Sequence, residues 1–255
     1  MTDLLTELHD GIATLTFNRP ERRNAMSLGL MREFDAALRS AADDDLVRVV
    51  VIAGAGGKAF GAGLDIKEAP TLSAGEQAEQ HGLYEGLQQM LADFPKPVVA
   101  AIEGVAAGGS LQMALHADLI VVAQGARIGM PELSAGRPCI MGSFLLDRSI
   151  GPGLTARLVL GQDWLDADGA VACGLAALAV PQGGALDAAR TYAARLANTA
   201  PKALAATLAW LRVLRNGGGR SLAEAIAHAD TILPESAAND EATTASARFS
   251  RGAHA

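Results

Sequence analysis

The hydrophobic and polar positions begin with a pattern typical of paired strands. Short apolar runs over residues 4–8 and 12–17 are separated by Asp10-Gly11. Because Asp-Gly fits a tight two-residue turn, these runs predict a β-hairpin. Ser27 then precedes apolar residues at helical spacing, which predicts a helix over 28–42 with Ser27 as its N-cap.

The middle of the chain alternates between apolar strand-like runs and helical or glycine-rich stretches. Strands are predicted over 47–53, 98–103, 119–123, 126–129 and 175–180, and helices over 73–94, 108–117, 154–160 and 166–173. Strands that alternate with helices predict a mostly parallel α/β core.

The last part of the chain carries helical patterns only. Helices are predicted over 186–198, 201–215 and 221–233, and Ser221 with Glu224 matches a capping box. The tail over 237–255 is weakly apolar, so we expect it to need a partner surface to become ordered.

Composition excludes several classes of protein. The chain has 255 residues, 50% of them hydrophobic and 4% aromatic, with a formal net charge of −7. It is long enough for a large core, and too acidic and too poor in aromatic side chains for a general nucleic-acid binder. The N-terminus does not resemble a signal peptide, and no apolar run is long enough to span a membrane, so we expect a cytoplasmic protein.

Cysteine and histidine spacing gives no sign of a metal or a disulfide framework. Cys139 and Cys173 lack a paired spacing, and the histidines form no metal-binding pattern. We therefore expect a reducing compartment and no metal ion.

A glycine-rich stretch over 54–65 directly follows a predicted strand, and four interpretations are considered. As a dinucleotide fingerprint it has glycines in a permitted spacing, but Gly61 and Gly63 fall where a regular helix should run. A phosphate-binding loop does not fit, because Lys58 is followed by Ala59 and not by Ser or Thr. The remaining interpretations are a tight turn without a ligand and a loop that offers backbone N–H groups to an oxyanion.

A second stretch nearly without side chains, over 105–110, also follows a predicted strand. Small residues let backbone amides approach a ligand closely, and the start of a helix leaves N–H groups unpaired. Two such loops on neighbouring strands can aim one N–H each at the same oxygen, which is the geometry of an oxyanion hole.

Three motifs in order resemble the crotonase (enoyl-CoA hydratase/isomerase) family. They are N-R-P-E-R-R-N-A-M-S over 18–27, V-V-V-I-A-G-A-G-G-K-A-F-G-A-G-L-D-I over 49–66, and P-K-P-V-V-A-A-I-E-G-V-A-A-G-G-S-L-Q-M-A-L-H-A-D over 95–118. The similarity runs from about residue 10 to the region of Cys173, and more loosely to the end of the chain.

This resemblance implies a fold, an assembly and a ligand. The expected fold is an α/β spiral of repeated ββα units over 1–197, with a C-terminal helical region over 198–255 that assembles trimers, often paired into hexamers. The expected substrate is an acyl-CoA thioester, with coenzyme A as part of the substrate and no further cofactor. The thioester oxygen would be held by the backbone amides of Leu64 and Gly109 while an enolate forms.

The resemblance also implies a set of substrate-contacting residues. The acyl and pantetheine path and the CoA phosphates would be lined by Arg22, Arg23, Ala25, Ala62, Gly63, Asp65, Ile66 and Gly108. For Arg22 and Arg23, a solvated turn is an equally good interpretation.

The catalytic carboxylates depart from the hydratase pattern of the family. Hydratases carry two glutamates; the first position is Gln112 here, and the second is retained as Glu132 in Gly129-Met130-Pro131-Glu132. An amide cannot take up a proton at neutral pH, although it can hold a water molecule. Moving a double bond from C3 to C2 needs a single base, which Glu132 can supply. Without the resemblance, Glu132 would more simply be a solvated turn carboxylate.

Arg137 is a second departure, because hydratases of the family are usually neutral there. It can bind a carboxylate on the acyl group or pair with Asp147, and the pairing is favoured because most arginines are structural or solvated.

Three functions follow. The favoured one is a Δ3-Δ2 enoyl-CoA isomerase with Glu132 as the single base. The second is an enoyl-CoA hydratase of altered mechanism, or a hydrolase or decarboxylase that uses the same oxyanion hole. The third is a non-catalytic acyl-CoA-binding subunit.

Overall fold

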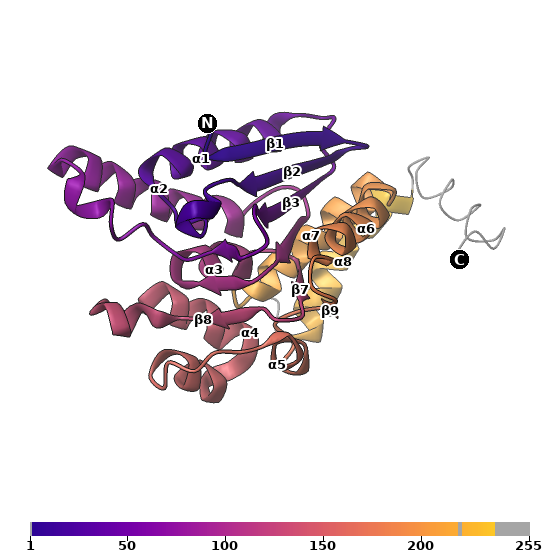
Figure 1. The fold of residues 1–255 in the computed structure, drawn as a ribbon. Coiled ribbons are helices and arrows are strands. Elements are labelled where there is room, and N and C mark those ends of the chain that lie inside the picture. Colours follow the sequence, from indigo (N-terminus) through magenta and orange to yellow (C-terminus); the bar gives the residue numbers. More distant parts are fainter. Residues whose placement is uncertain (1, 219–220, 238–255) are drawn as a thin grey trace. The chain divides into compact units, whose positions relative to one another are not determined.

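A computed structural model describes residues 2–218 and 221–237 (Figure 1). The chain divides into two compact units, residues 1–194 and 195–255, which are described separately below. Within the described ranges, no helix has both the length and the apolar character needed to cross a membrane.

The chain starts with the predicted hairpin. Strands β1 (Leu4–His9) and β2 (Ile12–Phe17) pair antiparallel, with His9 opposite Ile12. Asp10 and Gly11 between them both have positive φ, at 48° and 76°. That conformation is the one a two-residue hairpin turn requires, and it explains why Asp-Gly predicted the hairpin correctly.

A six-stranded sheet forms the larger part of the first unit. Its order is β1-β2-β3-β5-β7-β9, and every pair after the hairpin is parallel. The added strands are β3 (Val49–Gly54), β5 (Val98–Ile102), β7 (Leu119–Ala123) and β9 (Leu178–Val180). The predicted, mostly parallel α/β core is confirmed.

A second, three-stranded parallel sheet consists of β4 (Ala59–Gly61), β6 (Val105–Ala107) and β8 (Arg127–Gly129). Each of these strands follows a strand of the large sheet after a short loop: β4 follows β3, β6 follows β5 and β8 follows β7. The prediction of a glycine-rich loop throughout 54–65 was therefore wrong at β4, and the second predicted loop was wrong at β6, which ends at Ala107 directly before helix α3 (Gly108–Leu115). A strand of three small or buried residues has too little alternation to be recognised in a sequence.

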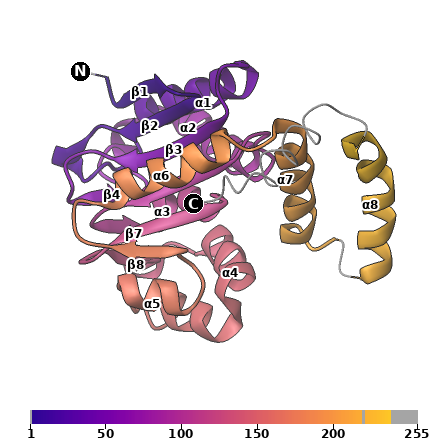
Figure 2. The ribbon, with the colours of Figure 1, turned by 90° about the vertical axis from the view of Figure 1, so that its right-hand side faces the viewer.

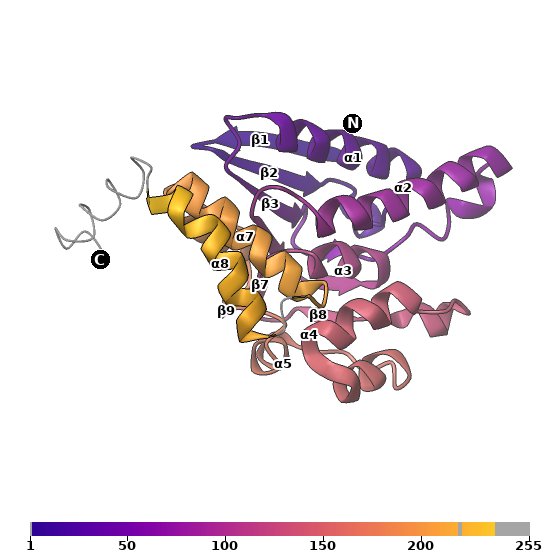
Figure 3. The same ribbon diagram turned by 180° about the vertical axis from the view of Figure 1, so that it is seen from behind.

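Helices follow the strand pairs. They are α1 (Leu28–Asp43), α2 (Ala74–Ala92), α3 (Gly108–Leu115), α4 (Ile140–Val159), α5 (Ala167–Ala172) and α6 (Ala185–Ala197). The Ser27 side chain accepts a hydrogen bond from the N–H of Leu30, so the predicted N-cap is confirmed. Helices α1 and α2 pack together over one face of the β1-β2-β3 region, as the views from the front and from behind both show (Figures 1 and 3).

Helix α6 lies in front of the strands in Figure 2, and two polar contacts join it to the large sheet. The N–H of Ala185 donates to the side chain of Glu103 just beyond β5, and Arg190 pairs with Glu7 on β1. The strands are thereby held between covering helices on their two faces.

Helix α4 is longer than predicted. The sequence indicated a helix only over 154–160, whereas α4 begins at Ile140 and is interrupted at Gly151, which has φ 77° and ψ 168°. Its first half leaves Ile140 and Phe144 exposed, so it lacks the one-sided apolar pattern that predicts a helix.

The second unit contains α7 (Pro201–Arg215) and α8 (Leu222–Ala237). The capping box predicted for Ser221 and Glu224 is present, with each side chain bonded to the other residue's N–H. The rings of Trp210 on α7 and His228 on α8 stack with centroids 4.6 Å apart. The predicted tail lies outside the described residues from 238 onward.

Gly104 joins β5 to β6 and leads into the second small-residue loop. Its φ is +61°, and a Cβ there would lie 2.1 Å from the carbonyl oxygen of Lys58. Gly125 also has a positive φ, +84°, but no atom lies within 4 Å of its Cβ position. Comparing alanine substitutions at the two positions therefore separates the free-energy cost of a left-handed backbone from the cost of a steric clash with backbone atoms.

We expect Gly104→Ala to lower the free energy of unfolding by about 3 kcal/mol or more, the sum of left-handed backbone strain and overpacking. Gly125→Ala should cost only about 1–2 kcal/mol, from backbone strain alone. Denaturant unfolding of both variants measures the difference. Equal losses would show that the Lys58 carbonyl gives way at little cost.

Candidate active site

One cavity of about 1010 Å³ lies within the first unit. Its walls come from the turn after β2, the loop after β4, helices α2 and α3, and the segment from β8 into α4. The structure brings together around it every residue that the sequence put at the site: Arg22, Arg23, Ala25, Ala62, Gly63, Leu64, Asp65, Ile66, Gly108, Gly109, Gln112, Glu132 and Arg137.

The backbone N–H of Leu64 differs from those of the neighbouring residues, which all donate hydrogen bonds within the protein. The N–H groups of Ala62, Gly63 and Asp65 donate to the carbonyl of Arg23, the hydroxyl of Ser110 and the carbonyl of Met26, at 3.0 Å each. The N–H of Leu64 takes part in none of the hydrogen bonds found among the described residues. It is therefore the N–H of this loop that is available to a ligand.

The second N–H comes from the start of α3, which meets the first loop closely. A Cβ on Gly63 would lie 3.3 Å from the nitrogen of Gly109. Gly109 is the second residue of α3, where an N–H has no partner within the helix. The N–H groups of Leu64, in the loop after β4, and of Gly109, at the start of α3, thus adjoin on one cavity, and the helix dipole adds positive potential there.

Ser110 fastens the two loops together and was not singled out in the sequence. Its fully buried hydroxyl accepts the N–H of Gly63, and a Cβ on Gly61 would lie 2.5 Å from the Cβ of Ser110. Its place in the small-residue run was the available signal, but the partner lies 47 residues away.

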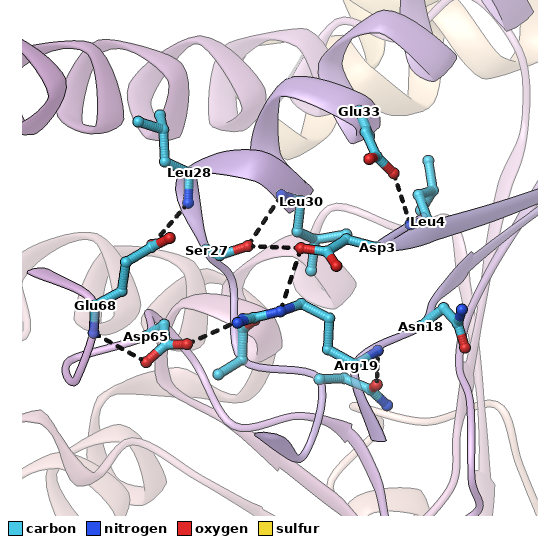
Figure 4. A network of polar contacts seen from close by, with 12 residues as sticks. Asp3, Leu4, Asn18, Arg19, Ser27, Leu28, Leu30, Glu33, Asp65 and Glu68 are labelled. Atoms are coloured by element: carbon cyan, nitrogen blue, oxygen red, sulfur yellow. Dashed lines mark hydrogen bonds and ion pairs between the residues drawn. The ribbon is translucent and has the colours of Figure 1, made fainter. Parts of the chain in front are cut away.

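Arg19, in the turn after β2, ties the first loop to the N-terminal part of the chain (Figure 4). Its guanidinium donates to the carboxylate of Asp65 at 3.0 Å and to the carbonyl of Ala25, and its Nε lies 3.3 Å from Asp3. Burial opposes the charge on Asp65, but the bonds from Arg19 outweigh it and lower the pKa of that carboxyl. Asp65 lines the cavity, yet its carboxylate is committed to holding the loop.

Glu132 lies in the 3-10 turn Pro131–Ala135 that follows β8. Its Oε1 accepts a hydrogen bond of 3.0 Å from the Nε2 of Gln112 and lies 3.5 Å from the Cβ position of Gly108. Its Oε2 is buried and has no hydrogen-bond partner among the described residues. One oxygen is therefore oriented, and the other keeps its lone pairs available for a proton.

Both the oxygen and the nitrogen of the Gln112 side-chain amide form hydrogen bonds. Its Oε1 accepts from the hydroxyl of Tyr84 at 2.6 Å and from the Nε2 of Gln88 at 3.1 Å. Gln88 in turn is 2.6 Å from the Nε2 of His116. Tyr84 and Gln88 were not singled out in the sequence. They lie in a mostly polar helix, whose sequence does not indicate which side chains contact another helix.

On the side of α4, the Gln112 amide lies near the sulfurs of Cys139 and Met130. A Cβ on Gly142 of α4 would lie 2.6 Å from the sulfur of Cys139, 2.9 Å from that of Met130 and 3.2 Å from Nε2 of Gln112. Burial, with the nearby carboxylate of Glu132 adding to it, raises the pKa of the Cys139 thiol to about 11. Burial also raises the pKa of the Tyr84 hydroxyl, so both groups stay neutral at physiological pH.

The pairing favoured for Arg137 was wrong. Arg137 is exposed and lines the cavity, and it forms no ion pair with Asp147 or with another carboxylate of the described residues. Its N–H donates to the carbonyl of Glu132 at 2.9 Å, which turns the chain around Gly136 and keeps Arg137 at the cavity. Asp147 lies on α4, outside the cavity lining.

Comparison with known proteins places this geometry in a family. The family model described as enoyl-CoA hydratase/isomerase matches residues 7–247. The chain belongs to the enoyl-CoA hydratase/isomerase family. Members of this family act on acyl-CoA thioesters.

Several relatives support the assignment. The chain is 34% identical over 174 residues to a crotonyl-CoA hydratase of Syntrophomonas wolfei, which covers 68% of this chain and 67% of the relative. It is 33% identical over 215 residues to a 2,3-dehydroadipyl-CoA hydratase of Escherichia coli, covering 83% and 82%. The crystal structure of an enoyl-CoA hydratase/carnithine racemase from Magnetospirillum magneticum matches with a TM-score of 0.85 at 28% identity, covering 99% of this chain and 94% of that one. The ββα spiral with C-terminal helices is thus the crotonase fold.

We expect Asp65→Asn to lower the free energy of unfolding at pH 7 by about 1–3 kcal/mol, because the substitution keeps the shape but loses a charge-assisted bond from Arg19. The folded pKa of Asp65 is lowered, so its contribution is present above the unfolded pKa of about 4 and is lost as the pH falls through the folded value. Urea unfolding of both proteins between about pH 7 and pH 3 should show the difference shrinking with acidification. A difference independent of pH would mean that the ion pair with Arg19 does not stabilise the fold.

Proposed function

We propose that this enoyl-CoA hydratase/isomerase family enzyme moves a double bond from C3 to C2 of an enoyl-CoA, with Glu132 as its single base. The supporting observation is the state of Gln112. Both acceptor positions of its carbonyl oxygen are filled by Tyr84 and Gln88, and one of its N–H groups is given to Glu132. Gln112 therefore has no acceptor left for the hydrogen of a water molecule.

Gln112 can hold a water molecule only through the remaining hydrogen of its Nε2, because its carbonyl oxygen already accepts two hydrogen bonds. Hydration needs a group that removes a proton from water while another protonates carbon. Gln112 cannot serve as either, and its acceptor oxygen is saturated. A single carboxylate with an unpartnered oxygen, Oε2 of Glu132, is sufficient for a proton shuttle.

The proposed reaction conserves all its atoms. Glu132 removes one proton from C2 of a 3-enoyl thioester, and the electron pair of that C–H bond moves into a dienolate whose charge lies on the thioester oxygen. The N–H groups of Leu64 and Gly109 stabilise that oxygen more in the dienolate than in the thioester, which is what lowers the barrier. Glu132 then returns the proton to C4, and the 2-enoyl thioester leaves.

The cationic side chains of the cavity suggest how the CoA portion binds. Arg22, Arg23 and Lys67 are exposed, line the cavity and form no ion pair among the described residues. We propose that Arg22 or Arg23 meets the CoA phosphates, which such cations bind despite the overall acidic charge.

Hydration is the second candidate, because relatives of this chain are named hydratases. It would require a water activated by Glu132 alone. A non-catalytic acyl-CoA-binding subunit is the third, and it would bind CoA esters without turnover. A paired assay separates the three: a 3-enoyl-CoA and its 2-enoyl isomer are incubated separately with the enzyme, and the absorbance of the conjugated enoyl thioester is followed.

We expect Glu132→Gln to reduce isomerisation of the 3-enoyl ester by about 10³-fold, in the range typical of a lost general base. The substitution keeps the size of the side chain, so binding of the ester should change little. Glu7→Gln makes the same chemical change on β1, away from the cavity lining, and should leave the rate unchanged. An unchanged rate in Glu132→Gln would sink the proposal.

Gln112→Glu tests what the amide contributes. The variant places a second carboxylate against Oε1 of Glu132, where Gln112 now donates at 3.0 Å. Like charges at that separation favour one shared proton, so we expect isomerisation to fall by about 10-fold or more. Strong hydration of the 2-enoyl ester by this variant would instead indicate a pocket otherwise built for hydration.

A further inference from the structure

A buried polar array links helices α2 and α3 behind the catalytic carboxylate. Tyr84 and Gln88 lie one turn apart on α2, and Gln112 and His116 lie one turn apart at α3 and its C-terminal end. Gln88, Gln112 and His116 are 4%, 5% and 6% exposed. We call these four side chains the α2–α3 array.

Only one assignment of donors and acceptors satisfies all hydrogen bonds of the array. An ionised Glu132 accepts hydrogen bonds only, so the atom of Gln112 that faces it at 3.0 Å must be the amide nitrogen. The carbonyl oxygen of Gln112 then faces Tyr84 and Gln88, both of which donate to it.

The same logic continues to His116. Because Gln88 uses its nitrogen toward Gln112, its oxygen faces His116 at 2.6 Å, and Nε2 of His116 must carry a hydrogen. Reversing any one amide would set two donors or two acceptors against each other, at a cost of about 1–3 kcal/mol for each buried group left unpaired. The array therefore has one low-energy arrangement.

We propose that Tyr84, Gln88 and His116 are positioning residues, which lock the Gln112 amide so that it donates to Glu132 and leaves the other carboxylate oxygen for the proton. The inference rests on the proposed function only in taking Glu132 as the base. The burial of the Tyr84 hydroxyl raises its pKa and keeps it protonated, as a donor must be.

A double-mutant cycle tests whether Tyr84 acts through Gln112. Tyr84→Phe removes the hydroxyl and keeps the ring that packs on Gly109, and we expect kcat to fall roughly 3- to 10-fold with KM unchanged, as for one lost hydrogen bond. Gln112→Leu should lower kcat by at least as much. If Tyr84 works through Gln112, the double variant equals Gln112→Leu; multiplied effects overturn the proposal.

The direction of the array is tested by Gln88→Glu against Gln88→Met. The carboxylate introduced by Gln88→Glu keeps an acceptor for His116 but has no donor for Gln112, so it favours the reversed Gln112 amide. We expect Gln88→Glu to lower kcat more than Gln88→Met. A purely structural role predicts the opposite order, because Gln88→Glu retains a bond to His116.

A second readout separates this proposal from the isomerase assignment. Exchange of the C2 hydrogens of butyryl-CoA with deuterium from D₂O, followed by mass spectrometry, reports the base without any double-bond shift. Exchange in the wild type without isomerisation would remove the isomerase assignment. The double-mutant cycle of Tyr84 and Gln112 would then be measured with exchange rates in place of kcat. Exchange that persists in Glu132→Gln would overturn both.

Tyr192→Phe is the matched control, because Tyr192 is the other tyrosine of the chain and lies on α6 outside the cavity lining. Its kcat should be unchanged, and thermal unfolding should show all variants folded. Nitrogen-15 NMR of His116, assigned with His116→Gln, gives an answer independent of activity. A neutral His116 protonated at Nδ1 alone would contradict the proposed direction of the array.

Discussion

The hydrogen bond from the N–H of Gly63 to the hydroxyl of Ser110 is the contact on which the site depends. It joins the loop after β4 to the start of α3, two segments that come from different ββα units. With the neighbouring N–H groups occupied, the N–H of Leu64 is left available at the cavity beside that of Gly109. The close approach also explains the absence of side chains at Gly61 and Gly63, where a Cβ would meet Ser110 or the backbone of α3.

Two further polar networks, one around Arg19 and one formed by the α2–α3 array, hold the segments that this contact joins. Arg19 holds Asp65 and so the far end of the first loop, while the α2–α3 array orients the carboxylate of Glu132 near the second. Both systems place buried charge or buried amides where every partner is specified. Such networks are costly when one member is missing, and they stabilise a single arrangement when complete.

Gln112 is the side chain through which the fold and the proposed chemistry meet, because it contacts Glu132 directly. The fold places the N–H groups of Leu64 and Gly109 and the side chain of Glu132 at one cavity. The amide of Gln112 is a fixed donor to Glu132, because its oxygen is held by Tyr84 and Gln88. Arg137 adds a positive charge to the cavity lining, exposed and without a carboxylate partner among the described residues.

The sequence by itself determined the features that depend on neighbouring residues: the Asp10-Gly11 turn, the Ser27 cap, the strands of the large sheet, and the motifs that mark Leu64, Gly109 and Glu132. Tertiary structure decided the three-stranded sheet, the first half of α4, and the partners of Gly63, Asp65 and Gln112. Those partners lie 47, 46 and 28 residues away for Ser110, Arg19 and Tyr84. Local patterns carry no information about which distant side chains meet, because packing of whole helices and sheets sets those contacts.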